Sequence, residues 1–209
     1  MSVGWRVGVF GGTFDPPHIG HAVVAREVVD AVGLDRLLWV PARIPPHKRG
    51  RAVTAAAVRR RMVEAAVGDD ARFVLCDLEL KREGVSYTVD TLRSLRAGHP
   101  AWSLFLILGP DLVAGFASWK EPEAIGRLAE LVAVSRAGMP VPPAAEAVGA
   151  CIVSVTPVDI SSSRIRSRVV RGEAVSDMVV PGVLSIIEGE RLYRAGPELR
   201  GGTRAGRKA

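Results

Sequence analysis

Two histidines three residues apart, His18 and His21, follow a pair of glycines near the start of the chain. Residues at this spacing share one face of a helix, so both imidazoles would point the same way. The adjacent glycines, Gly11 and Gly12, let the backbone turn tightly against a ligand, and the helix start just beyond them favours an anion. The pattern predicts a phosphate cradle in which both histidines donate hydrogen bonds to phosphate oxygens.

Two other interpretations of this stretch fit less well. A dinucleotide fingerprint needs three glycines in the order G-x-G-x-x-G and an acidic residue at the end of the second strand. Here that strand ends in Trp39, Val40 and Pro41. A metal pair is also disfavoured, because the chain has only four histidines and no cysteine or Glu-x-x-His partner near this pair. We therefore predict neither an NAD-dependent dehydrogenase nor a metal site.

A second set of anion-binding side chains follows the last candidate strand. Three consecutive serines, 161–163, precede a helical pattern, and Arg166 lies one turn into it. Hydroxyls, backbone N–H groups and a guanidinium at a helix start together suit phosphate. Serine-rich helix starts are common by themselves. Beside the first motif, this one indicates a nucleoside triphosphate, whose α-phosphate is held at one place and whose β- and γ-phosphates are held at another.

Alternating strands and helices must position both sets of anion-binding residues. Short β-branched runs predict the strands, while apolar periodicity with Ser, Thr or Pro start signals predicts the helices, one of them capped by Thr54. Such alternation produces crossover connections and a parallel sheet. The fold class is therefore α/β, a doubly wound parallel sheet. Strands are expected at 6–10, 36–40, 72–76, 103–108, 130–135 and 151–155, and helices at 19–32, 54–67, 88–97, 122–128, 162–170 and 181–190.

The length of 209 residues suits one domain, residues 1–194, followed by a basic flexible tail, residues 195–209. The net charge is +6, and the last sixteen residues carry +4 of it in a Gly- and Arg-rich end without apolar periodicity. We therefore predict no nucleic-acid partner. The loop at 41–53 has three prolines and a basic cluster, so a functional role is expected for it, whereas the loop at 137–149 is expected to be an exposed connector.

No run of the sequence reaches the roughly 18 apolar residues of a membrane span, and the start lacks the order of a signal peptide. A cytoplasmic protein without a membrane partner is expected. Cys76 and Cys151 lie too far apart for a metal knuckle or a redox pair, so both are expected to be buried, reduced and structural. The sequence leaves the oligomeric state open, a homo-oligomer among the alternatives.

The two anion motifs together resemble the nucleotidyltransferase superfamily that carries the HxGH motif, and within it the bacterial nicotinate-nucleotide adenylyltransferases. The first motif runs from Gly11 to His21, and the second from Ile160 to Arg166. Three further stretches occur in the family's order: Pro45-Pro46-His47-Lys48, Tyr87-Thr88-Val89-Asp90-Thr91-Leu92, and Gly109-Pro110-Asp111 followed by Trp119. The resemblance spans residues 6–194. This sequence departs from the family's pattern at Pro110, where a smaller residue is expected, and at Lys120-Glu121, where a second aromatic is common.

The resemblance implies a Rossmann-like nucleotidyltransferase fold and the transfer of an adenylyl group from ATP to nicotinate mononucleotide. It implies that magnesium arrives on the ATP phosphates and that His18, His21, Lys48 and Arg166 are catalytic. The ATP-binding residues implied are Gly11, Gly12, Thr13, Phe14, His21, Gly109, Asp111, Ile160, Ser162, Ser163 and Arg166. The residues implied for the second substrate are Thr13, His47, Lys48, Tyr87, Thr88, Trp119 and Arg136.

Within these sets, the backbone of residues 11–14 would approach the α-phosphate, while the serines and Arg166 would hold the β- and γ-phosphates. Asp111 suits the adenosine ribose. The predicted helix start at Tyr87 and Thr88 offers backbone N–H groups to the nicotinate carboxylate.

Three alternatives stay open at this stage. Another nucleotidyltransferase of the superfamily, such as the pantetheine-phosphate enzyme, would be shorter and would lack the Tyr87-Thr88 and Trp119 stretches. A class I aminoacyl-tRNA synthetase shares His18-Ile19-Gly20-His21 but needs a lysine-rich second motif and a much longer chain. A non-catalytic nucleotide sensor would need the phosphate cradle without two histidines.

Overall fold

The computed structural model describes residues 4–45, 53–137 and 143–194. Its strands form one parallel sheet in the order β3-β2-β1-β4-β5-β6. The strands are β1 (Arg6–Gly12), β2 (Arg36–Pro41), β3 (Phe73–Leu75), β4 (Ser103–Leu108), β5 (Glu130–Arg136) and β6 (Cys151–Val155). The helices are α1 (Ile19–Val32), α2 (Ala56–Val67), α3 (Leu78–Lys81), α4 (Thr88–Gly98), α5 (Pro110–Ala114), the 3₁₀ turn η2 (Phe116–Ser118), α6 (Pro122–Leu128), α7 (Pro143–Ala147), α8 (Ser162–Val170) and α9 (Pro181–Gly189).

The strand order reverses direction between β1 and β4. From β1 the chain builds outward to β2 and β3, and it then returns to place β4 on the other side of β1. The helix after β1 packs on one face of the sheet and the helix after β4 on the opposite face. A crevice forms where such connections diverge at the carboxyl ends of parallel strands, and ligands bind there in open α/β sheets.

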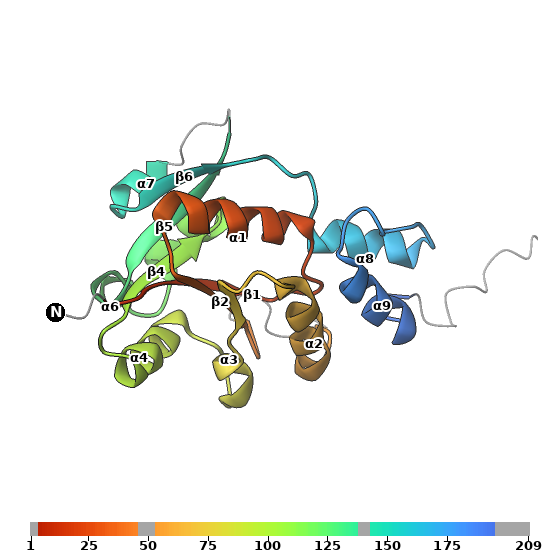
Figure 1. Cartoon of the computed structure of the whole chain (residues 1–209), viewed down its shortest axis with the longest axis horizontal. Coiled ribbons are helices and arrows are strands. Elements are labelled where there is room, and N and C mark those ends of the chain that lie inside the picture. The colour runs from red at the N-terminus through yellow and green to blue at the C-terminus, as the bar shows by residue number, and fades with distance from the viewer. Residues whose placement is uncertain (1–3, 46–52, 138–142, 195–209) are drawn as a thin grey trace, which may run out of the picture.

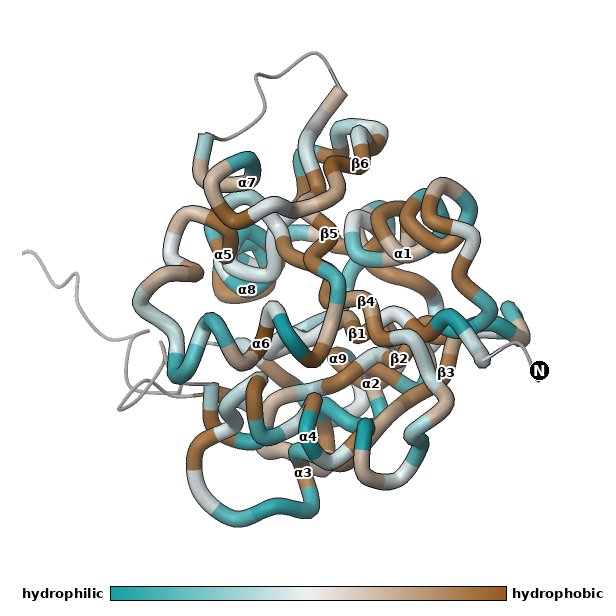
Figure 2. The backbone as a smooth tube through the Cα atoms, turned by 90° about the vertical axis from the view of Figure 1, so that its left-hand side faces the viewer, coloured by the Kyte–Doolittle hydropathy of each residue, from teal (hydrophilic) through white to brown (hydrophobic). Residues whose placement is uncertain are grey.

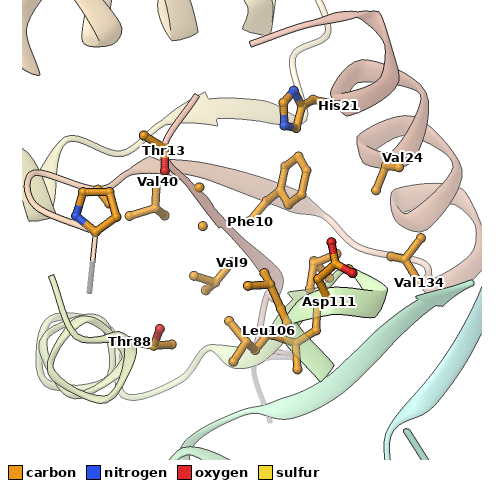
Figure 3. A pocket seen from close by; sticks show the side chains of 18 of the residues that line it. Val9, Phe10, Thr13, His21, Val24, Val40, Thr88, Leu106, Asp111 and Val134 are labelled. Carbon is orange, nitrogen blue, oxygen red and sulfur yellow. The ribbon is translucent and has the colours of Figure 1, made fainter. Parts of the chain in front are cut away.

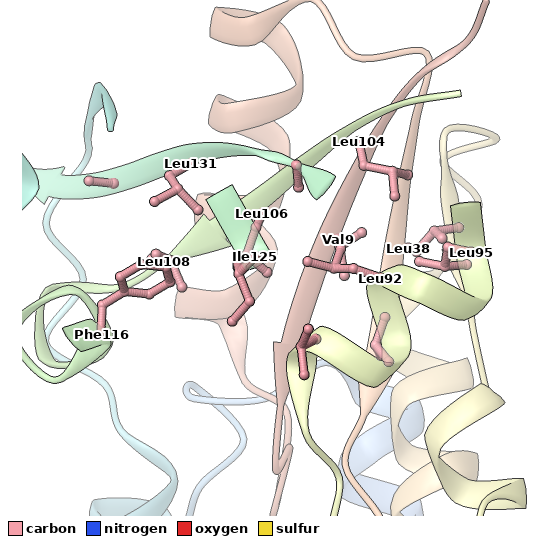
Figure 4. Close-up of a cluster of buried hydrophobic side chains, with 14 of the residues drawn as sticks. Val9, Leu38, Leu92, Leu95, Leu104, Leu106, Leu108, Phe116, Ile125 and Leu131 are labelled. Atoms are coloured by element: carbon pink, nitrogen blue, oxygen red, sulfur yellow. The ribbon is translucent and has the colours of Figure 1, made fainter. Parts of the chain in front are cut away.

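Apolar side chains on alternate strand positions supply the two faces of the core. On one face, Val9, Leu106 and Leu108 pack against Leu92 of α4 and Ile125 of α6 (Figure 4). On the other face, Trp39, Phe105 and Ile107 pack against α1 and α2. The central strands β2 and β4 are buried on both sides, as is usual in a parallel sheet, whereas the edge strand β6 is largely exposed. Figure 2 shows brown, hydrophobic backbone along much of the sheet and alternating colours on α4.

The last two helices lie beside α2, away from β6 (Figure 1). A third apolar cluster joins them, with Met62 of α2, Ile165 of α8 and Ile187 of α9 at most 2% exposed. The backbone N–H of Ile19, at the start of α1, also donates to the carbonyl of Met178 over 3.0 Å. This cluster therefore attaches α8, the helix of the serine motif, to the domain that carries the histidine motif.

All six strands and the six helices expected from periodicity are present, with bounds within two residues. Three expectations about a helix cap, a loop and the cysteines are wrong. The cap of α2 is Ala55 rather than Thr54, and no side-chain hydrogen bond caps it. The loop at 137–149 is no simple exposed connector, because it contains α7, whose Ala145 is fully buried. Cys151 lies on the edge strand β6 and is exposed rather than buried; Cys76 is half-buried, and both thiols are free.

Candidate functional site

A cavity of about 670 Å³ lies at the carboxyl ends of β1 and β4, at the reversal of the strand order. Figure 3 shows His21 and Thr88 on opposite sides of it. The volume suits a nucleotide-sized ligand. The structure brings much of the predicted site into one cavity, whereas Ser162, Ser163 and Arg166 do not line it. The predicted residues in the lining are Gly11, Gly12, Thr13, His18, His21, Tyr87, Thr88, Gly109, Asp111, Trp119 and Ile160.

The glycine pair leaves space beside the strand rather than forming a turn. Gly11 and Gly12 are the last two residues of β1, so the tight turn expected there is wrong. A Cβ on Gly11 would have no protein atom within 4 Å, whereas one on Gly12 would lie 2.9 Å from the Phe14 ring. Gly11 therefore leaves open space for a ligand against the strand, and Gly12 leaves space for the phenyl ring.

The start of α1 fixes both histidines. His18 is the N-cap residue and His21 is the third residue of the helix. The backbone N–H of His18 donates to Nδ1 of His21 over 3.1 Å, and the two rings lie 3.7 Å apart between centroids. Because Nδ1 accepts this bond, the proton of a neutral His21 imidazole sits on Nε2. A Cβ on Gly20 would lie 3.1 Å from Nδ1 of His18, which explains the glycine between the histidines.

Both imidazoles are held in the neutral form. Burial lowers the pKa of His18 from 6.5 to about 4. Burial also lowers the pKa of His21 well below 6.5, and the charge of His18 lowers it further. At neutral pH both rings are therefore hydrogen-bonding groups rather than cations.

Aromatic rings surround His21 on its inner side. Its ring centroid lies 5.1 Å from Phe14, 6.0 Å from Phe10 and 6.4 Å from Trp39. The Phe14 side chain is 2% exposed and does not line the cavity, although its backbone adopts a left-handed φ of 50° that turns the chain after β1. Phe14 thus packs on His21 with its side chain, and its predicted backbone contact with ATP stays a prediction.

The serine motif is bonded directly to the loop between β1 and α1. Ser161 caps α8 by accepting the backbone N–H of Arg164 at 3.2 Å. The Ser162 hydroxyl donates to the carbonyl of Pro16 at 2.8 Å, and Arg166 donates to the carbonyl of Asp15 at 2.8 Å. Arg166 also donates to the Ser163 hydroxyl at 3.3 Å. Two motifs about 150 residues apart are thereby adjacent, as a triphosphate site would need.

Arg59, a residue that the sequence analysis missed, ties the connection between β2 and α2 to the loop between β1 and α1. Its side chain is 1% exposed and donates to the carbonyls of Thr54, Thr13 and Arg43 at 2.8, 2.8 and 3.1 Å. Burial lowers the pKa of Arg59, and the nearby carboxylate of Asp15 opposes this effect. A buried charge is tolerated only when paired and hydrogen-bonded. No local pattern distinguished this arginine from the exposed ones around it in α2.

The start of α4, across the cavity from His21 (Figure 3), carries two of the residues predicted for the second substrate, Tyr87 and Thr88. Tyr87 is the N-cap residue of α4, and Thr88 is the first residue of the helix. The ammonium of Lys120 lies 4.8 Å from the centroid of the Tyr87 ring. Trp119 packs on Phe116 with 5.5 Å between centroids. Pro110 fits at the first position of α5, where a helix start tolerates proline, and Asp111 follows it.

The site as described so far does not include three of the predicted residues. His47 and Lys48 lie outside the described residues, so their predicted roles stay predictions. Arg136 is the last residue of β5, as expected. Among residues 4–45, 53–137 and 143–194, no group of three or more His, Cys, Asp and Glu side chains is arranged to hold a metal ion. No helix in the described part of the chain is long and apolar enough to cross a membrane.

A family model described as cytidylyltransferase-like matches residues 9–168. A relative from Thermus thermophilus, described as a probable nicotinate-nucleotide adenylyltransferase, is 43% identical over 189 residues, which cover 90% of this chain and all of the relative. One from Shouchella clausii with the same description is 40% identical over 188 residues, 90% of this chain and 96% of the relative.

A solved structure has the same fold. It is the Plasmodium falciparum nicotinic acid mononucleotide adenylyltransferase complexed with NaAD, which superposes with a TM-score of 0.76 at 20% identity. The superposition covers 90% of this chain and 97% of the other. At this identity the similarity establishes the architecture alone.

Proposed function

Because the chain belongs to the cytidylyltransferase-like family and, within it, to the nicotinate-nucleotide adenylyltransferases, enzymes of NAD biosynthesis, we propose that it joins ATP to nicotinate mononucleotide. The products are the deamido form of NAD and pyrophosphate. A phosphate oxygen of the mononucleotide forms a bond to the α-phosphorus of ATP. The bond from that phosphorus to the bridging oxygen breaks, and pyrophosphate leaves with the electron pair, without a covalent enzyme intermediate.

The attacking group needs no general base. The second pKa of a phosphate monoester is about 6, so at neutral pH the oxygen is already mostly ionised. Alignment of the two substrates and donors for the developing charge then supply the rate enhancement. The site residues should therefore donate hydrogen bonds rather than remove protons.

One observation carries this proposal: Nδ1 of His21 accepts the backbone N–H of His18. The remaining ring nitrogen, Nε2, then bears the proton and is available as a donor. With its pKa held well below 6.5 by burial, His21 keeps this form at neutral pH. We assign His21, with His18, to the oxygens of the transferring phosphoryl group, and the backbone of residues 11–14 to the α-phosphate.

The β- and γ-phosphates are assigned to Ser162, Ser163 and Arg166. Support comes from the bond of Arg166 to the Asp15 carbonyl, which holds the guanidinium beside the loop that follows β1. Magnesium would be carried by the phosphate oxygens themselves, which are the ligands it prefers. Lys48 and His47 would add positive charge over the phosphates of both substrates.

The adenosine end of ATP and the pyridine end of the mononucleotide are assigned to different walls of the cavity. Asp111 and Gly109, at the carboxyl end of β4, suit the adenosine ribose, with Ile160 and Thr13 completing the ATP site. The start of α4 at Tyr87 and Thr88, with Trp119, suits the nicotinate ring, and Arg136 suits the nucleotide phosphate. A cavity of about 670 Å³ that reaches both walls supports this division.

The test is pyrophosphate release by purified protein given ATP with nicotinate mononucleotide, with ATP alone as the blank. We expect pyrophosphate to be released when both substrates are present. Phosphopantetheine in place of the mononucleotide tests the nearest relative activity within the superfamily. ATP binding without pyrophosphate release under any of these conditions would instead identify a nucleotide sensor.

A further inference from the structure

Glu79 is a buried carboxylate in the wall of the cavity. It belongs to the short helix α3, is 7% exposed and lines the cavity together with Tyr87 and Thr88. None of the predicted binding or catalytic roles uses it. An acidic side chain is rarely this buried without a hydrogen-bonded function.

Hydrogen bonds connect Glu79 to both sides of the α4 start. The hydroxyl of Thr91, which is 1% exposed, donates to Oε1 of Glu79 over 2.6 Å. The hydroxyl of Ser86 also bonds to the Glu79 carboxylate. Ser86 in turn accepts the backbone N–H of Arg43 at 2.9 Å, so its orientation is fixed from a second direction. Glu79 thus spans Tyr87 and Thr88, which lie between its two partners.

The direction of these bonds requires an acceptor at position 79. Arg82 donates to the Thr91 hydroxyl oxygen over 2.9 Å. The single proton of that hydroxyl goes to Glu79 at 2.6 Å rather than to the Tyr87 carbonyl at 3.4 Å, because the shorter bond is the stronger one. Burial raises the pKa of Glu79, while the hydrogen bonds from Thr91 and Ser86 and the charge of Arg82 oppose this effect. These contacts occupy the carboxylate, so it acts on the helix start rather than on a substrate.

We propose that Glu79 is a positioning residue for the pyridine subsite, which holds the start of α4 so that its backbone N–H groups face the nicotinate ring. The inference rests on the proposed function and adds to it a residue that touches no reacting atom. Since the start of α4 that Glu79 contacts lies across the cavity from His21 (Figure 3), the loss of Glu79 should affect the mononucleotide and leave ATP binding unchanged.

The variant Glu79→Ala removes the acceptor for both hydroxyls. We expect KM for nicotinate mononucleotide to rise about tenfold or more, from the loss of a buried hydrogen-bond pair, while KM for ATP stays within about twofold. Glu79→Gln keeps one acceptor oxygen for Thr91 and should recover most of the affinity. Glu83→Ala is the matched control, because it removes an exposed carboxylate four residues away.

Thr91→Val and Ser86→Ala test the same contacts by removing the hydroxyls instead of the carboxylate. They also test the proposal if Glu79→Ala does not fold. Each should raise KM for the mononucleotide, and Thr91→Val should add little further effect to Glu79→Ala. Equal rises in both KM values, unchanged KM values, or fully additive effects would overturn the positioning role. Absence of pyrophosphate release by the unmodified protein would instead refute the proposed function, so the two failures are distinguishable.

Discussion

The phenolic hydroxyl of Tyr193 donates a hydrogen bond to Oδ1 of Asp15 over 2.7 Å, although 178 residues separate the two in the chain. Asp15 is 4% exposed, and its Oδ2 accepts the backbone N–H of Thr54 at 3.2 Å. Burial and the bond to the carboxylate raise the pKa of Tyr193, which keeps the phenol protonated as a donor. One carboxylate therefore fastens the end of the described chain to the loop of the phosphate cradle.

Tyr193→Phe should lower the free energy of unfolding by about 1 to 3 kcal/mol, because it leaves a buried carboxylate oxygen without its donor. Chemical denaturation measures the change. Ser185→Ala is the control, since it removes an exposed hydroxyl that bonds within α9, and should stay within about 0.5 kcal/mol. Equal effects of the two variants would mean that the Tyr193 bond contributes nothing specific.

Deleting residues 195–209 should leave turnover and the thermal midpoint almost unchanged, because this Gly- and Arg-rich stretch offers too little apolar surface to stabilise the domain. Deleting residues 193–209 should lower the midpoint, since Tyr193 is lost as well. Thermal scans of both truncations against the full chain check this. A large fall with the shorter deletion would show that the last fifteen residues contribute to the fold.

His21→Ala should lower turnover by about two to four orders of magnitude, because it removes a transition-state donor worth roughly 3 to 5 kcal/mol. The fold should persist, as judged by circular dichroism. His99→Ala is the control, since His99 stacks on Trp102 at the end of α4 and does not line the cavity. Near-normal turnover in a folded His21→Ala protein would contradict the donor role.

Acid should destabilise the protein through the buried histidines. The pKa of His18 is about 4 in the folded chain and about 6.5 when unfolded, so the unfolded state binds more protons between these values. Stability should therefore fall as pH drops from 6.5 to 4, by at most about 1.4 kcal/mol per pH unit for each such histidine. Denaturation curves across this range, compared with His18→Asn, should show a shallower slope in the variant; an unchanged slope would exclude His18 as the source.

Nicotinate mononucleotide should be preferred over nicotinamide mononucleotide by about a hundredfold or more in kcat/KM. Backbone N–H groups at the start of α4 suit a carboxylate, which only accepts hydrogen bonds, whereas an amide turns its own NH2 toward some of those donors. Each unsatisfied buried group costs about 1 to 3 kcal/mol. Rates with the two substrates at fixed ATP measure the preference, and equal values would remove the carboxylate-reading role of Tyr87 and Thr88.

Local patterns in the sequence were sufficient for the sheet, the longer helices and the two phosphate motifs. Each of these is determined by neighbouring residues, through apolar periodicity or a short motif such as His18-Ile19-Gly20-His21. The helices α3, α5 and α7 were missed because four or five residues are too few to show a helical period. The exposure of Cys151 was missed because a strand pattern does not reveal that the strand lies at the sheet edge.

Tertiary structure alone decided which charged residues are buried. Asp15, Arg59 and Glu79 resemble surface residues in the sequence, yet each is at most 7% exposed. Their partners come from other elements of the fold: Tyr193 for Asp15, the Thr13 carbonyl for Arg59 and Thr91 for Glu79, which are 178, 46 and 12 residues away. Burying a charge is favourable only where folding brings hydrogen-bonding partners to it, and no local pattern contains that information, because the partners become neighbours only when the sheet and its crossovers have formed.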